Sequence, residues 1–150
     1  MVPKGLPKEP GTYVLILRLA RQMSLSVGQL GEFELPAGWY AYVGSAHGPG
    51  GLASRVARHQ RASKKLHWHI DYLRSHADLT AVWYLAAGVK RECTWAKMLA
   101  KLPSTSMPVP RFGASDCGCP AHLLWFRKEP DPTAFASLVG DPVSTHSLNT

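Results

Sequence analysis

The sequence predicts a small α/β domain of the α+β type, in which a mainly antiparallel sheet of three to four strands is flanked by helices. Apolar runs rich in β-branched and aromatic residues follow one another with short connections in the first third of the chain, which is typical of an antiparallel meander. After residue 51 the apolar spacing changes to that of an amphipathic helix. With 150 residues and 45% hydrophobic content, the chain can form one core.

The predicted strands are short apolar runs. We expect them at residues 12–20 ("TYVLILRLA"), 24–35 ("SLSVGQLGEFEL"), 38–44 ("GWYAYVG") and 81–87 ("AVWYLAA"), with an edge strand at 122–127. The first should be central in the sheet, and the second should carry a bulge or turn at Gly28 and Gly31. In the third, Tyr40 and Tyr42 share one face because side chains alternate along a strand.

Helices are predicted at residues 52–61, 67–76, 91–102 and 131–139. On the first of them, "LASRVARHQR", Arg55 and His59 are four residues apart, so both side chains can reach a common target. Pro103 ends the third helix, and Asp131 caps the fourth.

A single domain is predicted over residues 11–141. It has a core at 11–102 and a C-terminal extension at 103–141, which begins with an irregular segment rich in Pro, Ser and Gly. The first ten residues contain three prolines, and both they and residues 142–150 are expected to be flexible tails.

The composition argues against a secreted or membrane protein. No apolar run approaches the ~18 residues that cross a bilayer, and the N-terminus lacks the pattern of a secretion signal. The three cysteines, two of which are separated by one residue, fit a reducing compartment better than a disulfide framework. We therefore expect a cytoplasmic protein with no membrane partner.

Positive charge is concentrated in one part of this chain, whose net charge is +7. Between Leu35 and Asp78 there are six arginines and lysines and five of the seven histidines, but only one acid, Asp71. A solvated charged face is the simpler interpretation, but cations beside aromatic residues are also typical of phosphate-backbone binding. The candidate nucleic-acid contacts are Ser45, Arg58, Arg61, Lys64, Lys65 and His69.

The expected partner is DNA, and single-stranded and branched forms are both open. A basic surface does not read bases, so the sequence does not separate DNA from RNA. The glycine-rich loop "GSAHGPGG" at 44–51 lacks the lysine of a P-loop, which argues against nucleotide binding. Its glycines would instead let the backbone approach a phosphate.

Several motifs, taken in order, resemble the GIY-YIG nuclease superfamily over residues 11–102. "GTYVL" matches the first motif, "YVGSA" matches the second, and "RVARH" on a helix is followed by an acid on a later helix. Within the superfamily, "GGL", "RHQR", "KKLHWHIDYL" and "FGASDCGCPAHL" are most similar to a small group that occurs alone or fused to base-excision DNA glycosylases. The segment between the first two motifs is longer than usual, which implies an enlarged hairpin.

The resemblance implies an endonuclease that hydrolyses DNA phosphodiester bonds with one Mg²⁺ or Mn²⁺ ion, in repair or DNA processing. It implies that Tyr42 acts as or near the general base, with Tyr13 beside it. It also implies that Arg55 contacts the phosphate with His59 one turn away, and that Glu92 holds the metal. These roles are physically coherent, because hydrolysis concentrates negative charge on phosphate oxygens and on the departing oxygen. A tyrosine, whose ordinary pKa is ~10, needs a nearby cation to act as a base.

Structural roles stay open for each of these residues. Strand tyrosines commonly pack in sheets, a helix arginine can face solvent, and an acid such as Glu92 can stabilise a helix start. Arg58 is the nearest rival of Arg55 for the phosphate. The alternative function is a non-catalytic nucleic-acid-binding module with a basic face.

The segment "DCGCPAH" supplies Asp116, Cys117, Cys119 and His122, and Cys93 is expected close to it. One interpretation is a zinc site, although a single residue between cysteines is a tighter spacing than is usual. The other is a loop packed over the active site that contributes Asp116 or His122. The loop interpretation is favoured, and zinc is a possible but not a favoured cofactor.

Overall fold

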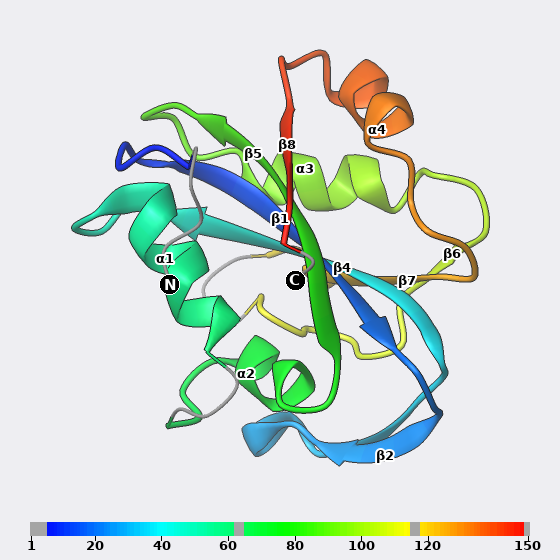
Figure 1. The fold of residues 1–150 in the computed structure, drawn as a ribbon. Helices are drawn as coiled ribbons and strands as arrows, with labels where there is room; N and C mark the ends of the chain where they lie inside the picture. The colour runs from blue at the N-terminus through cyan, green and yellow to red at the C-terminus, as the bar shows by residue number, and fades with distance from the viewer. Residues whose placement is uncertain (1–5, 62–64, 115–117, 149–150) are drawn as a thin grey trace.

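The protein is described by a computed structural model over residues 6–61, 65–114 and 118–148. Its main element is a six-stranded sheet with the order β6-β7-β4-β1-β5-β8, in which every neighbouring pair is antiparallel (Figure 1). The strands of this sheet are β1 (Gly11–Leu19), β4 (Gly38–Ala46), β5 (Asp78–Ala86), β6 (Thr105–Ser106), β7 (Leu123–Phe126) and β8 (Ser144–Ser147). The fold is therefore mixed α/β, as predicted, but its sheet has more strands than expected.

Helices cover both faces of the sheet (Figure 1). On one face are α1 (Gly51–Gln60) and α2 (His69–Arg74), which pack on the side chains of Tyr13, Leu15 and Leu17. On the other are α3 (Glu92–Leu99) and α4 (Pro132–Val139), which pack on Val14 and Ile16. Strand β1 is thus central and covered on both sides, which explains why its sequence is almost continuously apolar.

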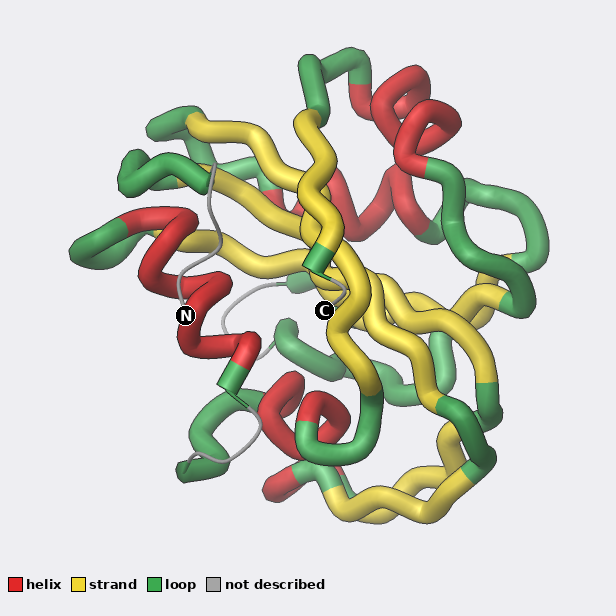
Figure 2. The backbone as a smooth tube through the Cα atoms, viewed as in Figure 1, coloured by secondary structure: helices red, strands yellow, loops and turns green. Residues whose placement is uncertain are grey.

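The expected second strand is instead a separate hairpin. Residues 24–35 do not join the main sheet but form β2 (Met23–Ser26) and β3 (Glu32–Leu35), joined by the short helix η1 (Gly28–Leu30) (Figure 2). Gly28 and Gly31 have positive φ angles of 49° and 114°, a conformation that favours glycine and that reverses the chain here. The hairpin lies within the connection between β1 and β4, where the family resemblance implied an enlarged hairpin.

The described parts of both expected tails are ordered. Before β1, the carbonyl of Glu9 accepts a hydrogen bond from the Leu52 amide and that of Pro7 accepts one from Ala53, both at 2.9 Å. After α4, residues 144–147 form β8 on the edge of β5. The sequence predicted flexible tails here because backbone pairing, which leaves no apolar pattern, holds both segments. Residues 1–5 and 149–150 lie outside the described residues.

The remaining differences concern element boundaries. The second predicted helix begins only at His69, because the Asp71 carboxylate accepts hydrogen bonds from the Trp68 and His67 amides and caps the helix start. The third ends at Leu99, and β7 is not an edge strand, since β6 lies outside it. The predicted cap of α4 is confirmed, because the Asp131 carboxylate accepts from the Thr133 amide at 2.9 Å. No helix within the described residues is both long enough and apolar enough to cross a bilayer.

Candidate functional site

Two buried tyrosines lie on neighbouring strands of the sheet. Tyr13 on β1 pairs with Gly44 on β4, and Tyr42 pairs with Leu15, so the two phenols are diagonal neighbours on the face covered by α1. Gly44 is required by this arrangement, because a Cβ atom there would lie 2.4 Å from the hydroxyl oxygen of Tyr13. The absence of a side chain at position 44 lets the phenol of Tyr13 extend across β4.

Helix α1 places a histidine against both phenols. The Tyr13 hydroxyl is hydrogen-bonded to His59 Nε2 at 2.8 Å, and His59 is fully buried. The ring centroids of Tyr42 and His59 are 6.3 Å apart in an edge-to-face arrangement. His59 faces the sheet because it belongs to the buried stripe of α1, together with Leu52 and Val56.

Arg55, one turn before His59, lies at the half-buried rim of this arrangement. Its Nη1 atom donates to the backbone oxygen of Ser45 at 3.1 Å, and its guanidinium stacks 4.6 Å from the ring centre of Trp68. Burial raises the pKa of Tyr13, and the charge and a hydrogen bond of the Arg55 guanidinium oppose this rise. Arg55 is thus held by backbone and aromatic contacts, and no carboxylate among the described residues forms an ion pair with it.

Glu92 reaches the same region from the opposite face of the sheet. It is the first residue of α3, whose start is fixed at the beginning of β1 by a hydrogen bond of 3.2 Å from the Arg91 amide to Thr12 Oγ1. The carboxylate is close enough for its charge to raise the pKa of Tyr42 and, more weakly, of Tyr13. We call Tyr13, Tyr42, Arg55, His59 and Glu92 the tyrosine–arginine cluster.

Both phenols are neutral at neutral pH. Burial raises the pKa of Tyr42, the charge of Glu92 raises it further, and the charge of Arg55 opposes the change. Burial likewise raises the pKa of Tyr13, with Tyr42 acting in the same direction and Arg55 opposing. The two hydroxyls therefore act as hydrogen-bonding groups, and an added positive charge would be needed to favour phenolate.

Arg58 has a structural role. Its guanidinium forms a bidentate ion pair with the buried carboxylate of Asp71, with both N–O distances at 2.9 Å, and lies 4.0 Å from the ring centre of Trp68. This pair ties α1 to the start of α2. Of the two rival arginines, Arg58 is therefore bound to a carboxylate, whereas Arg55 adjoins the phenols.

A shallow basic hollow runs along the outer side of α1. It has a volume of about 400 Å³, and its lining includes Lys8, Arg55, Arg58 and Arg61. Arg61 is exposed at the end of the helix, as is Lys65 beyond it. Lys64 lies outside the described residues. The hollow leads to the tyrosine–arginine cluster through Arg55, which belongs to both.

The other predicted nucleic-acid contacts connect neighbouring loops. Ser45 Oγ is hydrogen-bonded to His47 Nδ1 at 2.6 Å. His69 Nδ1 accepts from the Gly113 amide at 2.7 Å, which joins α2 to the loop before β7. Burial lowers the pKa of His69, consistent with a neutral ring that accepts at Nδ1. Gly113 has a φ angle of 70°, and a Cβ there would lie 2.8 Å from the Tyr42 ring, so this loop lies directly against the cluster.

The cysteine-rich segment also approaches the cluster. Cys93, Cys119 and His122 bring their ligand atoms within 4.8 Å of one another. Burial lowers the pKa of His122, and the negative charge of Glu92 partly opposes this change. His122 is therefore close enough to the Glu92 carboxylate to interact with its charge. Asp116 and Cys117, two further residues of the predicted zinc site or active-site loop, lie outside the described residues.

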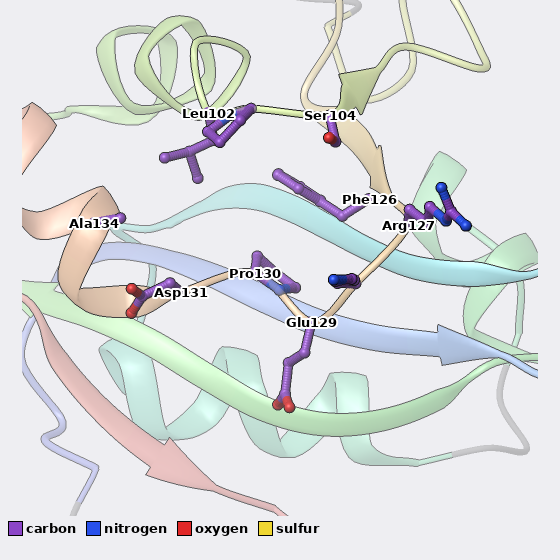
Figure 3. Close-up of a pocket in the computed structure, with 10 residues that line it drawn as sticks. Leu102, Ser104, Phe126, Arg127, Glu129, Pro130, Asp131 and Ala134 are labelled. Carbon is purple, nitrogen blue, oxygen red and sulfur yellow. The ribbon is translucent and has the colours of Figure 1, made fainter.

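The largely apolar hollow shown in Figure 3 lies elsewhere. It has a volume of about 450 Å³ and lies between the end of α3, β7 and the start of α4, with Leu102, Phe126 and Ala134 among its lining residues. None of the predicted site residues lines it. The hollow is therefore separate from the tyrosine–arginine cluster.

Two contacts of the site escaped sequence reasoning. Trp68 stacks with both Arg55 and Arg58, and Asp71 neutralises Arg58. The signal for Asp71 was present, because it is the only acid between Leu35 and Asp78 and a lone acid in a basic segment favours ion pairing. No comparable pattern marked Trp68 as the platform for two guanidinium groups.

Neither curated proteins nor solved structures gave a match to this sequence. One family model does match, and it spans residues 12–142, from the second residue of β1 to the segment between α4 and β8. The match includes every member of the tyrosine–arginine cluster as well as the cysteine-rich segment. The chain belongs to the family described as "Domain of unknown function DUF123".

Proposed function

We propose that this protein is a metal-dependent endonuclease of the GIY-YIG type that hydrolyses phosphodiester bonds in DNA, in repair or another DNA-processing reaction. The observation that carries the proposal is the convergence of phenols, guanidinium, imidazole and carboxylate at the end of the sheet where β1 begins. These groups come from four separate elements. The order of the motifs along the chain supports the superfamily, because the two tyrosines lie on the adjacent strands β1 and β4.

Arg55 is the group best placed to bind the scissile phosphate. It combines a positive charge with a half-buried position, and it belongs to both the basic hollow and the cluster. A guanidinium binds two phosphate oxygens at once, and this attraction strengthens as negative charge grows on them during hydrolysis. Stacking on Trp68 restricts the side chain before substrate arrives, which lowers the entropy lost on binding.

Tyr42 is assigned to the attacking water and Tyr13 to its orientation. Tyr42 is the more exposed of the two tyrosines, at 9% against 1%. The negative charge of Glu92 and the positive charge of Arg55 both act on its pKa, in opposite directions. Tyr13 is hydrogen-bonded to His59 and is assigned a positioning role beside Tyr42. Because the pKa of Tyr42 is raised, its hydroxyl must first lose its own proton to solvent, which nearby positive charge would favour; only the resulting phenolate can accept a proton from the attacking water.

The residues present fit a hard divalent ion such as Mg²⁺ or Mn²⁺ at Glu92. The donors here are oxygens, namely a half-exposed carboxylate with the Tyr42 hydroxyl in its vicinity. The two ion pairs in the described part of the chain involve Asp71 and Asp141, so neither neutralises Glu92. Mg²⁺ is commonly held by one or two carboxylates while it keeps several waters. Once bound, the ion would supply positive charge for the departing oxygen and lower the pKa of water.

A non-catalytic nucleic-acid-binding module is the second candidate. It is favoured by one observation, the burial of both phenols, because a packed and protonated tyrosine is also what a purely structural role requires. In that case the basic hollow along α1 would bind the phosphate backbone, and Glu92 would serve only to stabilise the start of α3. The two candidates differ in what Glu92 does.

A cleavage screen separates the candidates. The full chain is incubated with single-stranded, duplex and branched DNA and with RNA, in Mg²⁺ or Mn²⁺ and in EDTA. We expect metal-dependent cutting of at least one DNA, reduced by about 10²- to 10³-fold in Arg55→Ala and in Glu92→Gln. Glu92→Gln should retain DNA affinity. Matched controls are Arg127→Ala and Glu129→Gln, which change exposed residues after β7.

The outcomes are distinct. Salt-sensitive DNA binding without cutting, and with no effect of Glu92→Gln, would establish the binding module. Cutting that persists unchanged in both Arg55→Ala and Glu92→Gln would overturn the assignment of the site. Preference for RNA over every DNA would keep the mechanism and replace the substrate.

A further inference from the structure

Three metal-ligating side chains from separate parts of the chain meet beside α3. Cys93 is in the first turn of α3, Cys119 is in the loop before β7, and His122 immediately precedes β7. Their ligand atoms lie within 4.8 Å of one another, and Cys93 Sγ is 4.0 Å from His122 Nε2. Cys119 and His122 are buried and Cys93 is half-buried, so the three form a partly enclosed group.

We propose that Cys93, Cys119 and His122 bind a zinc ion, which clamps the loop before β7 to the start of α3. With Zn–S bonds of about 2.3 Å and a Zn–N bond of about 2.0 Å, the ligand atoms of a tetrahedral site are about 3.5 to 3.8 Å apart. The separations of up to 4.8 Å exceed these values by at most about 1 Å, so small side-chain rotations complete the geometry. The fourth position is left to water or to one more ligand.

The ligand chemistry selects a soft ion. Two sulfurs and one imidazole nitrogen suit Zn²⁺, whereas Mg²⁺ and Mn²⁺ prefer oxygen donors such as the Glu92 carboxylate. Both thiols bind as thiolates, so binding releases their protons to solvent. The zinc site is therefore chemically separate from the site proposed at Glu92, even though Cys93 is the next residue.

The backbone around the buried ligands is held by other contacts. The His122 amide donates to the Phe112 carbonyl at 2.7 Å, and the His122 carbonyl accepts from the Val43 amide at 2.9 Å. Arg111 Nη1 donates to the Cys119 carbonyl at 2.7 Å. An ion entering this group meets ligands whose main chain is already ordered, which reduces the entropy cost of binding.

A disulfide between Cys93 and Cys119 is the competing chemistry. It would use the two sulfurs but not His122, whose Nε2 atom lies 4.0 Å from Cys93 Sγ. Zinc accounts for all three side chains. Because Cys93 follows Glu92 in α3, a zinc ion at Cys93 would also help to fix the position of Glu92. Any effect of zinc on cleavage rests on the proposed function, but zinc binding itself does not.

The test measures metal in the purified chain. The full-length protein is expressed with zinc, purified under reducing conditions without chelators, and assayed by plasma mass spectrometry. We expect about one zinc per chain, and an occupancy lowered by about tenfold in Cys93→Ser, Cys119→Ser and His122→Asn. His76→Asn, which changes an exposed histidine, should keep full occupancy.

A second measurement does not depend on the variants. The wild-type protein is stripped of metal and titrated with Co²⁺, and we expect thiolate-to-cobalt absorption and the visible bands of a tetrahedral site, both abolished by stoichiometric Zn²⁺. Wild-type protein with only trace zinc and no saturable cobalt spectrum would overturn the proposal. So would a peptide cross-linked through Cys93 and Cys119 under the same reducing conditions. These readouts involve no nucleic acid, so a failure here is distinguishable from a failure of the proposed nuclease.

Discussion

The two faces of the central sheet are built from the same strands but differ in chemistry. On the face of α3 and α4, β1 contributes Val14 and Ile16 to an apolar core containing Trp83, Trp95 and Phe135. On the face of α1 and α2, the alternate side chains of β1 and β4 include two tyrosines that contact the buried His59. The polar groups are thus concentrated on one face.

This difference separates the buried side chains that stabilise the sheet by apolar packing from the polar ones that do not. The apolar face shows that the sheet packs well on helices through hydrocarbon and aromatic contacts. Buried hydroxyl and imidazole groups add no comparable hydrophobic stabilisation and must be hydrogen-bonded to be tolerated. Their presence on the other face favours a functional reason for them. The following substitutions test the contrast.

The largest effect is expected on the apolar face. Phe135 is fully buried, with its ring 5.2 Å from that of Trp95 and 5.4 Å from that of Trp83. Phe135→Ala should lower the free energy of unfolding by about 3 to 5 kcal/mol, measured by urea denaturation, because it leaves a cavity. Leu138→Ala, an exposed change on the same helix, is the control. Under the proposed function DNA affinity should not change, and a large loss in the folded variant would contradict the separation of the two faces.

The next effect concerns the ion pair behind the basic hollow. Burial alone would raise the pKa of Asp71, but hydrogen bonds from Arg58, Trp68 and His67 outweigh burial and lower it from 3.8 to about 2. The folded protein therefore holds the carboxylate ionised more strongly than the unfolded chain does. This contribution, about 2 kcal/mol, is fully present above about pH 4 and is lost as the pH falls towards 2.

Asp71→Asn should therefore destabilise the protein by about 2 kcal/mol at pH 7 and by progressively less below pH 4. Urea denaturation over this pH range measures the difference. Asp78→Asn, at an exposed position, serves as the control. A difference that stays constant down to pH 2 would show that the charge of Asp71 contributes nothing.

A smaller effect on stability is expected within the tyrosine–arginine cluster. Tyr13→Phe removes the hydroxyl bonded to His59 and should cost about 1 kcal/mol of unfolding free energy. Under the proposed function it should also slow cleavage by about 10²-fold. Tyr72→Phe on α2 is the matched control. A variant that loses stability but cuts DNA at the normal rate would assign Tyr13 to packing alone.

The smallest effect is expected at the start of α4. Asp131→Ala removes the helix cap, and its cost should be about 0.5 kcal/mol, because the residue is exposed. Thermal unfolding measures this loss of stability, with Glu129→Ala, a change at a neighbouring exposed residue, as the control. Under the proposed function cleavage should be unaffected, and a loss of activity would mean that α4 influences the site through α3.

Sequence reasoning succeeded where one strong local pattern determines structure. The apolar run of β1, the alternation in β4 and the helical spacing of α1 all predicted their elements. The helical spacing also placed Arg55 and His59 on one side of α1, whereas the position of Tyr13 beside Tyr42 was implied by the family resemblance. Strand β8 could not be found in this way. Its sequence "STHS" is polar and largely exposed, and pairing with β5 alone makes it a strand.

Contacts between distant segments were the other limit. Arg58 on α1 forms an ion pair with Asp71 on α2, 13 positions later, and Cys93 lies against His122 across 29 positions of sequence. No periodicity encodes such pairs, because they depend on how loops return to the sheet. The single residue between Cys117 and Cys119 made zinc the less favoured interpretation, although Cys93 was expected close to this segment.

The outer strands of the main sheet are short, with two residues in β6 and four in β8. Exposed strand edges are the usual template on which a second copy of a chain adds by backbone pairing, and edges of this length offer few amide and carbonyl groups for it. The long strands β1, β4 and β5 all lie inside. The native molecule should therefore resist amyloid-like aggregation even when it is crowded.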